Sequence, residues 1–179
     1  MQRRQFLAST AAAGVAGAAG SRFHIIDPHV HVWKHDPKYP WAKETVKPPA
    51  TDFTPEMLLA NMKRCGVSRT VIIQVIHYRY DNSYLADVLQ QYPKEFAGVA
   101  RVDPLNPAAP DHLSRLVEQQ KFQGVRLSPA VDATGDWITG PLMPPLWKRC
   151  NDLKASMNIL TGPERLPAIA RLAEQFPGL

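Results

Sequence analysis

The fold is decided by the stretch Phe23-His24-Ile25-Ile26-Asp27-Pro28-His29-Val30-His31-Val32-Trp33. Its apolar first half predicts a short buried β-strand that runs directly into a His-x-His pair. Because side chains alternate along a strand, His29 and His31 are expected on one face, with Cα atoms ~7 Å apart at about 3.3 Å per residue. Both imidazoles can then reach one metal ion at ~2.0–2.1 Å. The alternative interpretation is two loop histidines beside a buried strand.

The rest of the chain repeats a strand followed by a helix. Apolar runs predict further strands, and apolar residues at helical spacing predict a helix after each strand. The expected later strands lie at residues 69–75, 96–103, 124–129 and 158–161. Capping residues mark the first helix, with Thr54-Pro55 at its start and Gly66 at its end. Strict alternation predicts a parallel sheet with right-handed crossovers.

Two α/β architectures contain such a sheet. A doubly wound sheet usually carries a glycine-rich phosphate loop after its first strand. In this chain the His-x-His pair and the aromatic loop 34–53 follow the first strand, which favours a (β/α)₈ TIM-barrel type with its chemistry at the C-terminal ends of the strands. Only about five βα units are present, so we expect the N-terminal part of a longer barrel. The alternative is a half-barrel that completes itself by dimerising, which makes a homo-oligomer an open expectation.

Composition limits the function classes. The 179 residues are 45% hydrophobic and 21% charged, which is typical of one soluble globular domain. The net charge is +5, but the basic residues are scattered and form no stripe with interleaved aromatic residues. Nucleic acid is therefore not an expected partner. The two cysteines, Cys65 and Cys150, do not make a disulfide framework.

The N-terminus reads as a targeting segment. Paired arginines, Arg3-Arg4, precede Phe6-Leu7 and an Ala/Gly-rich run to Gly20. This pattern predicts a twin-arginine export signal over residues 1–20, followed by the barrel domain over residues 21–179, and hence a periplasmic or secreted protein. The run is too short and too weakly apolar to serve as a stable membrane anchor. A frayed basic N-terminus is the alternative.

Residues 24–179 resemble the amidohydrolase superfamily, in particular the amidohydrolase-related group with its lactonase-like hydrolases and metal-dependent decarboxylases. The matching pieces are residues 26–33, 71–74, 77–82, 98–103 and 124–127. The resemblance implies a hydrolase that opens a cyclic ester or amide of a small molecule with metal-activated water. A decarboxylase of the same fold is the first alternative, and a non-catalytic half-barrel that dimerises is the second.

The resemblance also implies a metal centre. It assigns two ligands to His29 and His31, and it favours a divalent ion, zinc above others, although some lactonase-like relatives work without a metal. The other ligands and the general base are expected beyond Leu179. Two imidazoles leave a zinc ion half-coordinated, so this chain alone is expected to bind metal weakly and to be inactive.

Four residues are candidate substrate contacts. Arg126 lies at the exit of the fourth strand and can hold a carboxylate bidentately, which suggests a small, carboxylated substrate. Gln74 and His77 follow the second strand, and Trp41 lies in loop 34–53, where it can wall a pocket.

Each of these candidates has a structural alternative. Arg126 can form an ion pair with a loop acid such as Asp103 or Asp132, and His77 can be a hydrogen-bonded loop residue. Trp41 can pack the loop onto the barrel. Arg101 shares strand parity with Asp103 and is interpreted as part of a polar layer.

Overall fold

The computed structural model describes residues 24–129 and 137–179. The predicted export signal and Asp132 lie outside these residues. The strands are β1 (Ile25–Val30), β2 (Val67–Ile73), β3 (Phe96–Arg101), β4 (Gly124–Leu127) and β5 (Ser156–Ile159). The α-helices are α1 (Pro55–Cys65), α2 (Ser83–Gln91), α3 (Ala109–Gln120), α4 (Met143–Leu153) and α5 (Leu166–Gln175). Three short 3₁₀ helices are η1 (Ile76–Tyr78), η2 (Trp137–Thr139) and η3 (Pro163–Arg165).

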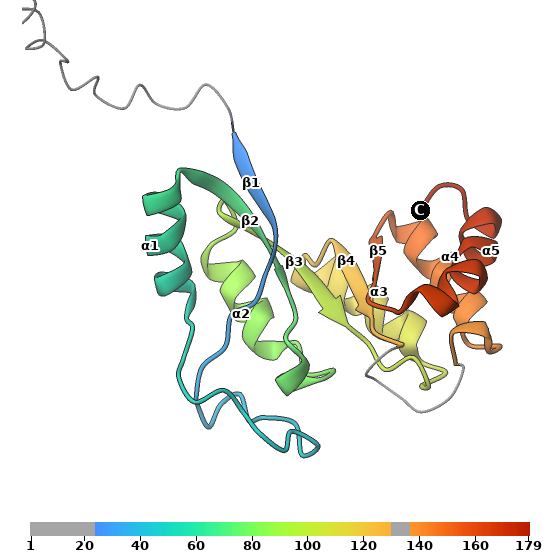
Figure 1. Cartoon of the computed structure of the whole chain (residues 1–179), viewed down its shortest axis with the longest axis horizontal. Helices are drawn as coiled ribbons and strands as arrows, with labels where there is room; N and C mark the ends of the chain where they lie inside the picture. Colours follow the sequence, from blue (N-terminus) through green and yellow to red (C-terminus); the bar gives the residue numbers. More distant parts are fainter. Residues whose placement is uncertain (1–23, 130–136) are drawn as a thin grey trace, which may run out of the picture.

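The five strands form one parallel sheet in the order β1-β2-β3-β4-β5. The strands follow an arc, and the helices lie along its outer side (Figure 1). This half-barrel confirms the predicted α/β fold with five βα units. No helix among the described residues is long and apolar enough to cross a membrane.

Helix α1 shows how local sequence sets an element. The Thr54 hydroxyl accepts a hydrogen bond from the Met57 backbone N–H, and Pro55 occupies the first turn, where its missing N–H costs nothing. Gly66 ends the helix at φ 71°, a left-handed conformation that glycine adopts without steric cost. Leu58 and Met62 face the core. Both ends agree with the sequence prediction.

Strand β1 departs from the prediction in burial and in regularity. It lies at one edge of the sheet, so Ile25 and Ile26 are 43% and 55% exposed. The pairing with β2 shifts register between Asp27 and Val30, because three steps along β1 match two along β2. This bulge breaks the simple alternation of side chains, and the strand ends at Val30, before His31.

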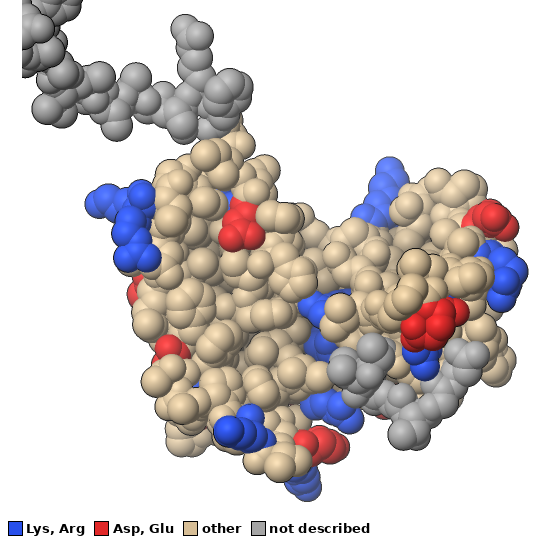
Figure 2. Space-filling view, in the orientation of Figure 1, with Lys and Arg blue, Asp and Glu red and all other residues tan. Residues whose placement is uncertain are grey.

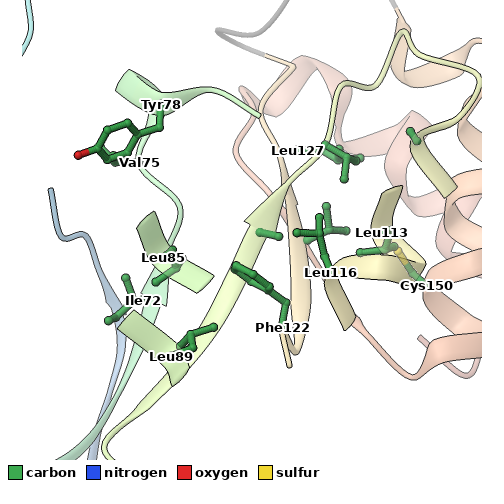
Figure 3. Packing of buried hydrophobic residues seen from close by; sticks show 14 of the residues in the cluster. Ile72, Val75, Tyr78, Leu85, Leu89, Leu113, Leu116, Phe122, Leu127 and Cys150 are labelled. Atoms are coloured by element: carbon green, nitrogen blue, oxygen red, sulfur yellow. The ribbon is translucent and has the colours of Figure 1, made fainter. Parts of the chain in front are cut away.

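The core lies between the sheet and the outer helices. Phe122, just before β4, is 1% exposed and is one of the largest fully buried side chains. Figure 3 shows it between Leu85 and Leu89 of α2 and Leu113 and Leu116 of α3. A single side chain thus packs against two helices and the sheet.

The two cysteines differ sharply in environment. Both are free thiols, Cys65 exposed at the end of α1 and Cys150 buried in α4. Burial raises the pKa of the Cys150 thiol to about 12, which suppresses the reactive thiolate. We expect a thiol reagent to label one cysteine quickly in the native chain and the second only in denaturant. Rapid labelling of Cys150 in the native Cys65→Ser variant, where it is the one remaining thiol, would contradict this burial.

Candidate functional site

A pocket of ≈ 400 Å³ opens at the C-terminal ends of β2, β3 and β4. Its polar lining consists of His31, Gln74, His77, Arg101, Arg126 and Ser128. The structure therefore brings four of the residues singled out in the sequence to one cavity, although they come from different βα units. This is the edge of the sheet where barrel enzymes place their chemistry.

His31 is held in a defined tautomer. Its Nδ1 lies 2.7 Å from the carbonyl oxygen of Ile73, the last residue of β2, and a carbonyl can only accept. Nδ1 must carry the proton, so Nε2 presents a lone pair. Burial lowers the pKa of His31; the hydrogen bond to Ile73 opposes this, while the positive charge of Arg126 adds to it. The imidazole is therefore neutral at pH 7, the form that a metal ligand requires.

His29 is exposed and meets Arg126 across the sheet. Nη1 of Arg126 donates to Nε2 of His29 at 3.1 Å, and a guanidinium can only donate. His29 is therefore also an imidazole with its lone pair on Nε2. The two histidine rings stand edge-on with centroids 5.1 Å apart, despite the bulge in β1.

Two guanidinium groups approach the same serine hydroxyl. Nη1 of Arg101 lies 3.0 Å from Oγ of Ser128, and Nε of Arg126 lies 3.4 Å from it. Arg101 is only 2% exposed, so its charge is delivered to the pocket and not to bulk solvent. The guanidinium plane matches the geometry of a carboxylate, which it can bind through two parallel hydrogen bonds.

The charge of the pocket favours an anion. Its described lining includes arginines and histidines but no aspartate or glutamate. Figure 2 shows basic side chains in blue near the middle of the face between the two ends of the sheet. A concave site with one sign of charge raises the local concentration of the opposite ion.

Gln74 and His77 line the pocket, but both are also engaged by backbone. The side-chain amide of Gln74 donates to the carbonyl of Asp81. The backbone carbonyl of His77 accepts from the Ala42 N–H at 2.8 Å and from the Thr45 hydroxyl at 2.9 Å. The His77 ring also stands edge-on to Trp41, with ring centroids 6.1 Å apart.

Trp41 is not brought to this pocket. It stacks on Tyr78 with ring centroids 4.6 Å apart and lines a neighbouring hollow of ≈ 580 Å³. Loop 34–53 is thus packed onto η1 at this point. Trp33 and Pro49, from the start and the far part of the same connection, do reach the pocket wall.

The sequence analysis interpreted Arg101 only as part of a polar layer, but its place in the pocket makes it a candidate binding residue. Strand parity correctly placed it on the inner face, but an arginine inside a strand carries no signal that separates a ligand-binding role from an ion pair. Its neighbour Asp103 lies beyond the end of β3 and does not line the pocket.

The histidine pair fits a divalent ion in chemistry. Two neutral imidazoles with Nε2 lone pairs are two of the four donors that tetrahedral zinc takes. Within residues 24–129 and 137–179, no group of three His, Cys, Asp or Glu side chains is placed to hold a metal. An ion bound at Nε2 of His29 would compete with the Arg126 guanidinium for the same lone pair. The described residues thus offer two of the donors that a zinc site would need.

The arc of βα units, with histidines and arginines at its C-terminal edge, defines an α/β half-barrel with a basic pocket at that edge. The sequence profile of the amidohydrolase family matches residues 26–179. The chain therefore belongs to the amidohydrolase family, as the sequence resemblance predicted.

The chain is similar to proteins with different named activities. It is 31% identical over 156 residues to an L-fucono-1,5-lactonase of Burkholderia ambifaria, covering 86% of this chain and 53% of the lactonase. A probable 2-pyrone-4,6-dicarboxylic acid hydrolase from Acinetobacter baumannii, solved with citric acid bound, superposes with a TM-score of 0.73 at 18% identity, covering 86% of this chain and 55% of the other.

A 5-carboxyvanillate decarboxylase from Novosphingobium aromaticivorans, solved with manganese and 4-hydroxy-3-methoxy-5-nitrobenzoic acid, gives a TM-score of 0.61 at 14% identity, covering 84% of this chain and 55% of the other. The chain thus spans about half the length of the relatives it matches. The solved structures share its barrel fold, and one of them holds a divalent metal.

Proposed function

We propose that this half-barrel belongs to a hydrolase that opens the ring of a small, carboxylated lactone. One observation carries the proposal: Arg101 and Arg126 converge on Ser128 in a pocket whose described lining holds no acidic side chain. The lactonase and the dicarboxylic acid hydrolase among the relatives support a cyclic ester as the substrate class.

The residues divide the work by chemistry. The guanidinium groups of Arg126 and Arg101 bind the substrate carboxylate and fix the orientation of the ring. His29 and His31 hold a divalent metal through Nε2, zinc being our choice, together with donors that the described residues do not contain. When bound, such an ion lowers the pKa of a water ligand and polarises a carbonyl. The Ile73 carbonyl keeps His31 in the ligand tautomer.

A decarboxylase is the second candidate. The decarboxylase relative was solved with a metal and a carboxylated aromatic ligand, and the pocket described above suits a carboxylate equally well. Product analysis separates the two reactions, because a lactonase gives a ring-opened acid and a decarboxylase releases CO₂.

Turnover is tested in a hybrid barrel, because the chain alone is expected to be inactive. Residues 24–179 replace the matched half of the Burkholderia lactonase. The hybrid is expected to open carboxylated lactones in a metal-dependent reaction, which is measured by the release of protons. The metal content of the purified hybrid distinguishes zinc from manganese. Hybrids with His29→Asn and His31→Asn should lose bound metal and activity together.

Three results would count against the lactonase proposal. They are release of CO₂ without ring opening, preference for the methyl ester over the free carboxylate, and no turnover by a folded hybrid that binds citrate.

We further propose that residues 1–20 direct export by the twin-arginine route, on the strength of Arg3-Arg4 and the Phe6-Leu7 that follows.

A further inference from the structure

We propose that Asn82 is a positioning residue, which fixes the end of strand β3 and thereby directs the Arg101 guanidinium into the pocket. The inference rests on the proposed function in one respect, namely that Arg101 binds the substrate carboxylate. Asn82 itself does not line that pocket.

The Asn82 carboxamide is saturated by backbone groups. Its Oδ1 accepts from the Arg101 N–H at 2.9 Å, and its Nδ2 donates to the Arg101 carbonyl at 2.9 Å. Nδ2 also donates to the Tyr80 carbonyl at 2.9 Å. The side chain is 6% exposed, so these bonds form away from solvent. One side chain thus forms hydrogen bonds with both the N–H and the carbonyl of Arg101.

The hydrogen bonds from Asn82 take the place of strand pairing at Arg101. β2 pairs with β3 as far as Ile73 with Val99, and the Gln74 N–H still donates to the Val99 carbonyl at 2.9 Å. The chain then turns into η1, so β2 provides no pairing for Arg101, the next residue of β3 that faces it. A carboxamide has the same donor and acceptor as a peptide group, and Asn82 continues the ladder by one step.

Arg101 is therefore held from both sides. On its other side it pairs with Arg126 of β4, and its Nη1 donates to Ser128. The Arg101 side chain has many rotamers, and a fixed backbone sets the point and direction from which that side chain extends. Loss of the Asn82 bonds would let the last residue of β3 fray, as an unpaired strand end does.

The segment that carries Asn82 is itself braced. The Gln74 side chain donates to the carbonyl of Asp81, directly before Asn82. Two carboxamides thus connect the end of β2 to the end of β3 through residues 80–82. Gln74 lines the pocket, whereas Asn82 lies outside it and lines a neighbouring hollow that Arg101 also lines. A residue that contacts ligand is thus supported by one that does not.

The test compares two identical substitutions in the 179-residue chain. Asn82→Asp keeps the acceptor for the Arg101 N–H but places a carboxylate against two carbonyl oxygens. The matched control is Asn106→Asp in the β3–α3 connection, where Oδ1 accepts from the Ala108 N–H at 2.9 Å and a carboxylate does the same. We expect Asn82→Asp to abolish the rigid NMR signal of the Arg101 Nε–H and to weaken citrate binding about tenfold. Asn106→Asp should change neither.

A double-mutant cycle separates positioning from general stability. If Asn82 acts through Arg101, Asn82→Asp causes no further loss of citrate affinity in an Arg101→Met background. An equal loss in that background, or a folded Asn82→Asp chain with an unchanged Arg101 signal, overturns the proposal. If Asn82→Asp does not fold, Asn82→Ser is expected to give the same loss of the Arg101 signal, and an unchanged signal overturns the proposal.

The NMR measurement keeps two failures apart. A wild-type chain that binds no citrate contradicts the carboxylate role in the proposed function. The Arg101 signal in the Asn82 variants still decides whether Asn82 positions that side chain.

Discussion

Replacing Arg126 by methionine is expected to weaken citrate binding by about 100-fold. The change keeps the length of the aliphatic stem and removes a guanidinium that lies between His29 and Ser128. Charge-assisted hydrogen bonds contribute about 1.5–3 kcal/mol each, and every 1.4 kcal/mol corresponds to about a factor of ten. Titration calorimetry with citrate, the ligand bound by the Acinetobacter relative, measures the loss directly.

Arg149→Met is the matched control for this prediction. Arg149 lies on α4, where it is paired with Asp111 at 4.0 Å, and it does not line the pocket. Such an exposed pair contributes little to stability, so citrate affinity should stay within about twofold of the parent value. Equal losses in both variants would show that citrate responds to net charge and not to a built carboxylate site.

Truncating Phe122 to alanine is expected to lower the free energy of unfolding by about 3–5 kcal/mol. The side chain is 1% exposed and packs between α2 and α3 against the sheet, so its removal leaves a cavity that neighbouring side chains cannot fill. Domains of this size are stable by about 5–15 kcal/mol, so the variant should be partly unfolded at moderate temperature. Urea unfolding followed by circular dichroism gives the difference.

Two substitutions calibrate this loss. Phe122→Leu keeps most of the buried volume and should cost about 1–1.5 kcal/mol. Leu105→Ala removes a side chain that is 52% exposed and should cost about 0.5 kcal/mol or less. A Phe122→Ala chain that unfolds at the same urea concentration as Leu105→Ala would mean that the core does not close over this position.

Helix α1 and the strand order were predictable because their causes are local. Thr54, Pro55 and Gly66 satisfy or remove backbone groups within a few residues, and the hydrophobic runs mark each strand. Helices α3 and α4 end differently, at Lys121 and Lys154 in the left-handed conformation, φ 65° and 53°. Lysine is no signal for that conformation, since tertiary packing and not local preference imposes it.

Strand ends were less predictable than strands. β2 to β5 each end two residues before the sequence prediction, because pairing stops where a neighbouring chain turns away, which apolar character does not reveal. The bulge between Asp27 and Val30 is equally hidden, since it depends on how β1 and β2 are joined. The prediction of one face for both histidines assumed a regular strand.

The sequence indicated several residues that line the pocket, but not how their side chains are arranged. His31, Gln74, His77 and Arg126 all follow or end strands, and parallel strands bring their C-terminal ends to one edge. Trp41 lies at the same edge of the sheet, but it stacks on Tyr78 and lines the neighbouring hollow. Contacts between side chains of distant units decide such details.

The hydrogen bonds that hold residues 34–53 in place affect the free energy of ligand binding. Trp33 bridges Phe53 by two backbone hydrogen bonds of 2.9 and 3.0 Å, and the Tyr39 hydroxyl donates to Asp87 at 2.5 Å. The connection that contributes Trp33 and Pro49 to the pocket wall is thus ordered before any ligand arrives. Its conformational entropy is lost during folding and not again on association, so a ligand meets a preorganised wall and keeps more of its contact energy as affinity.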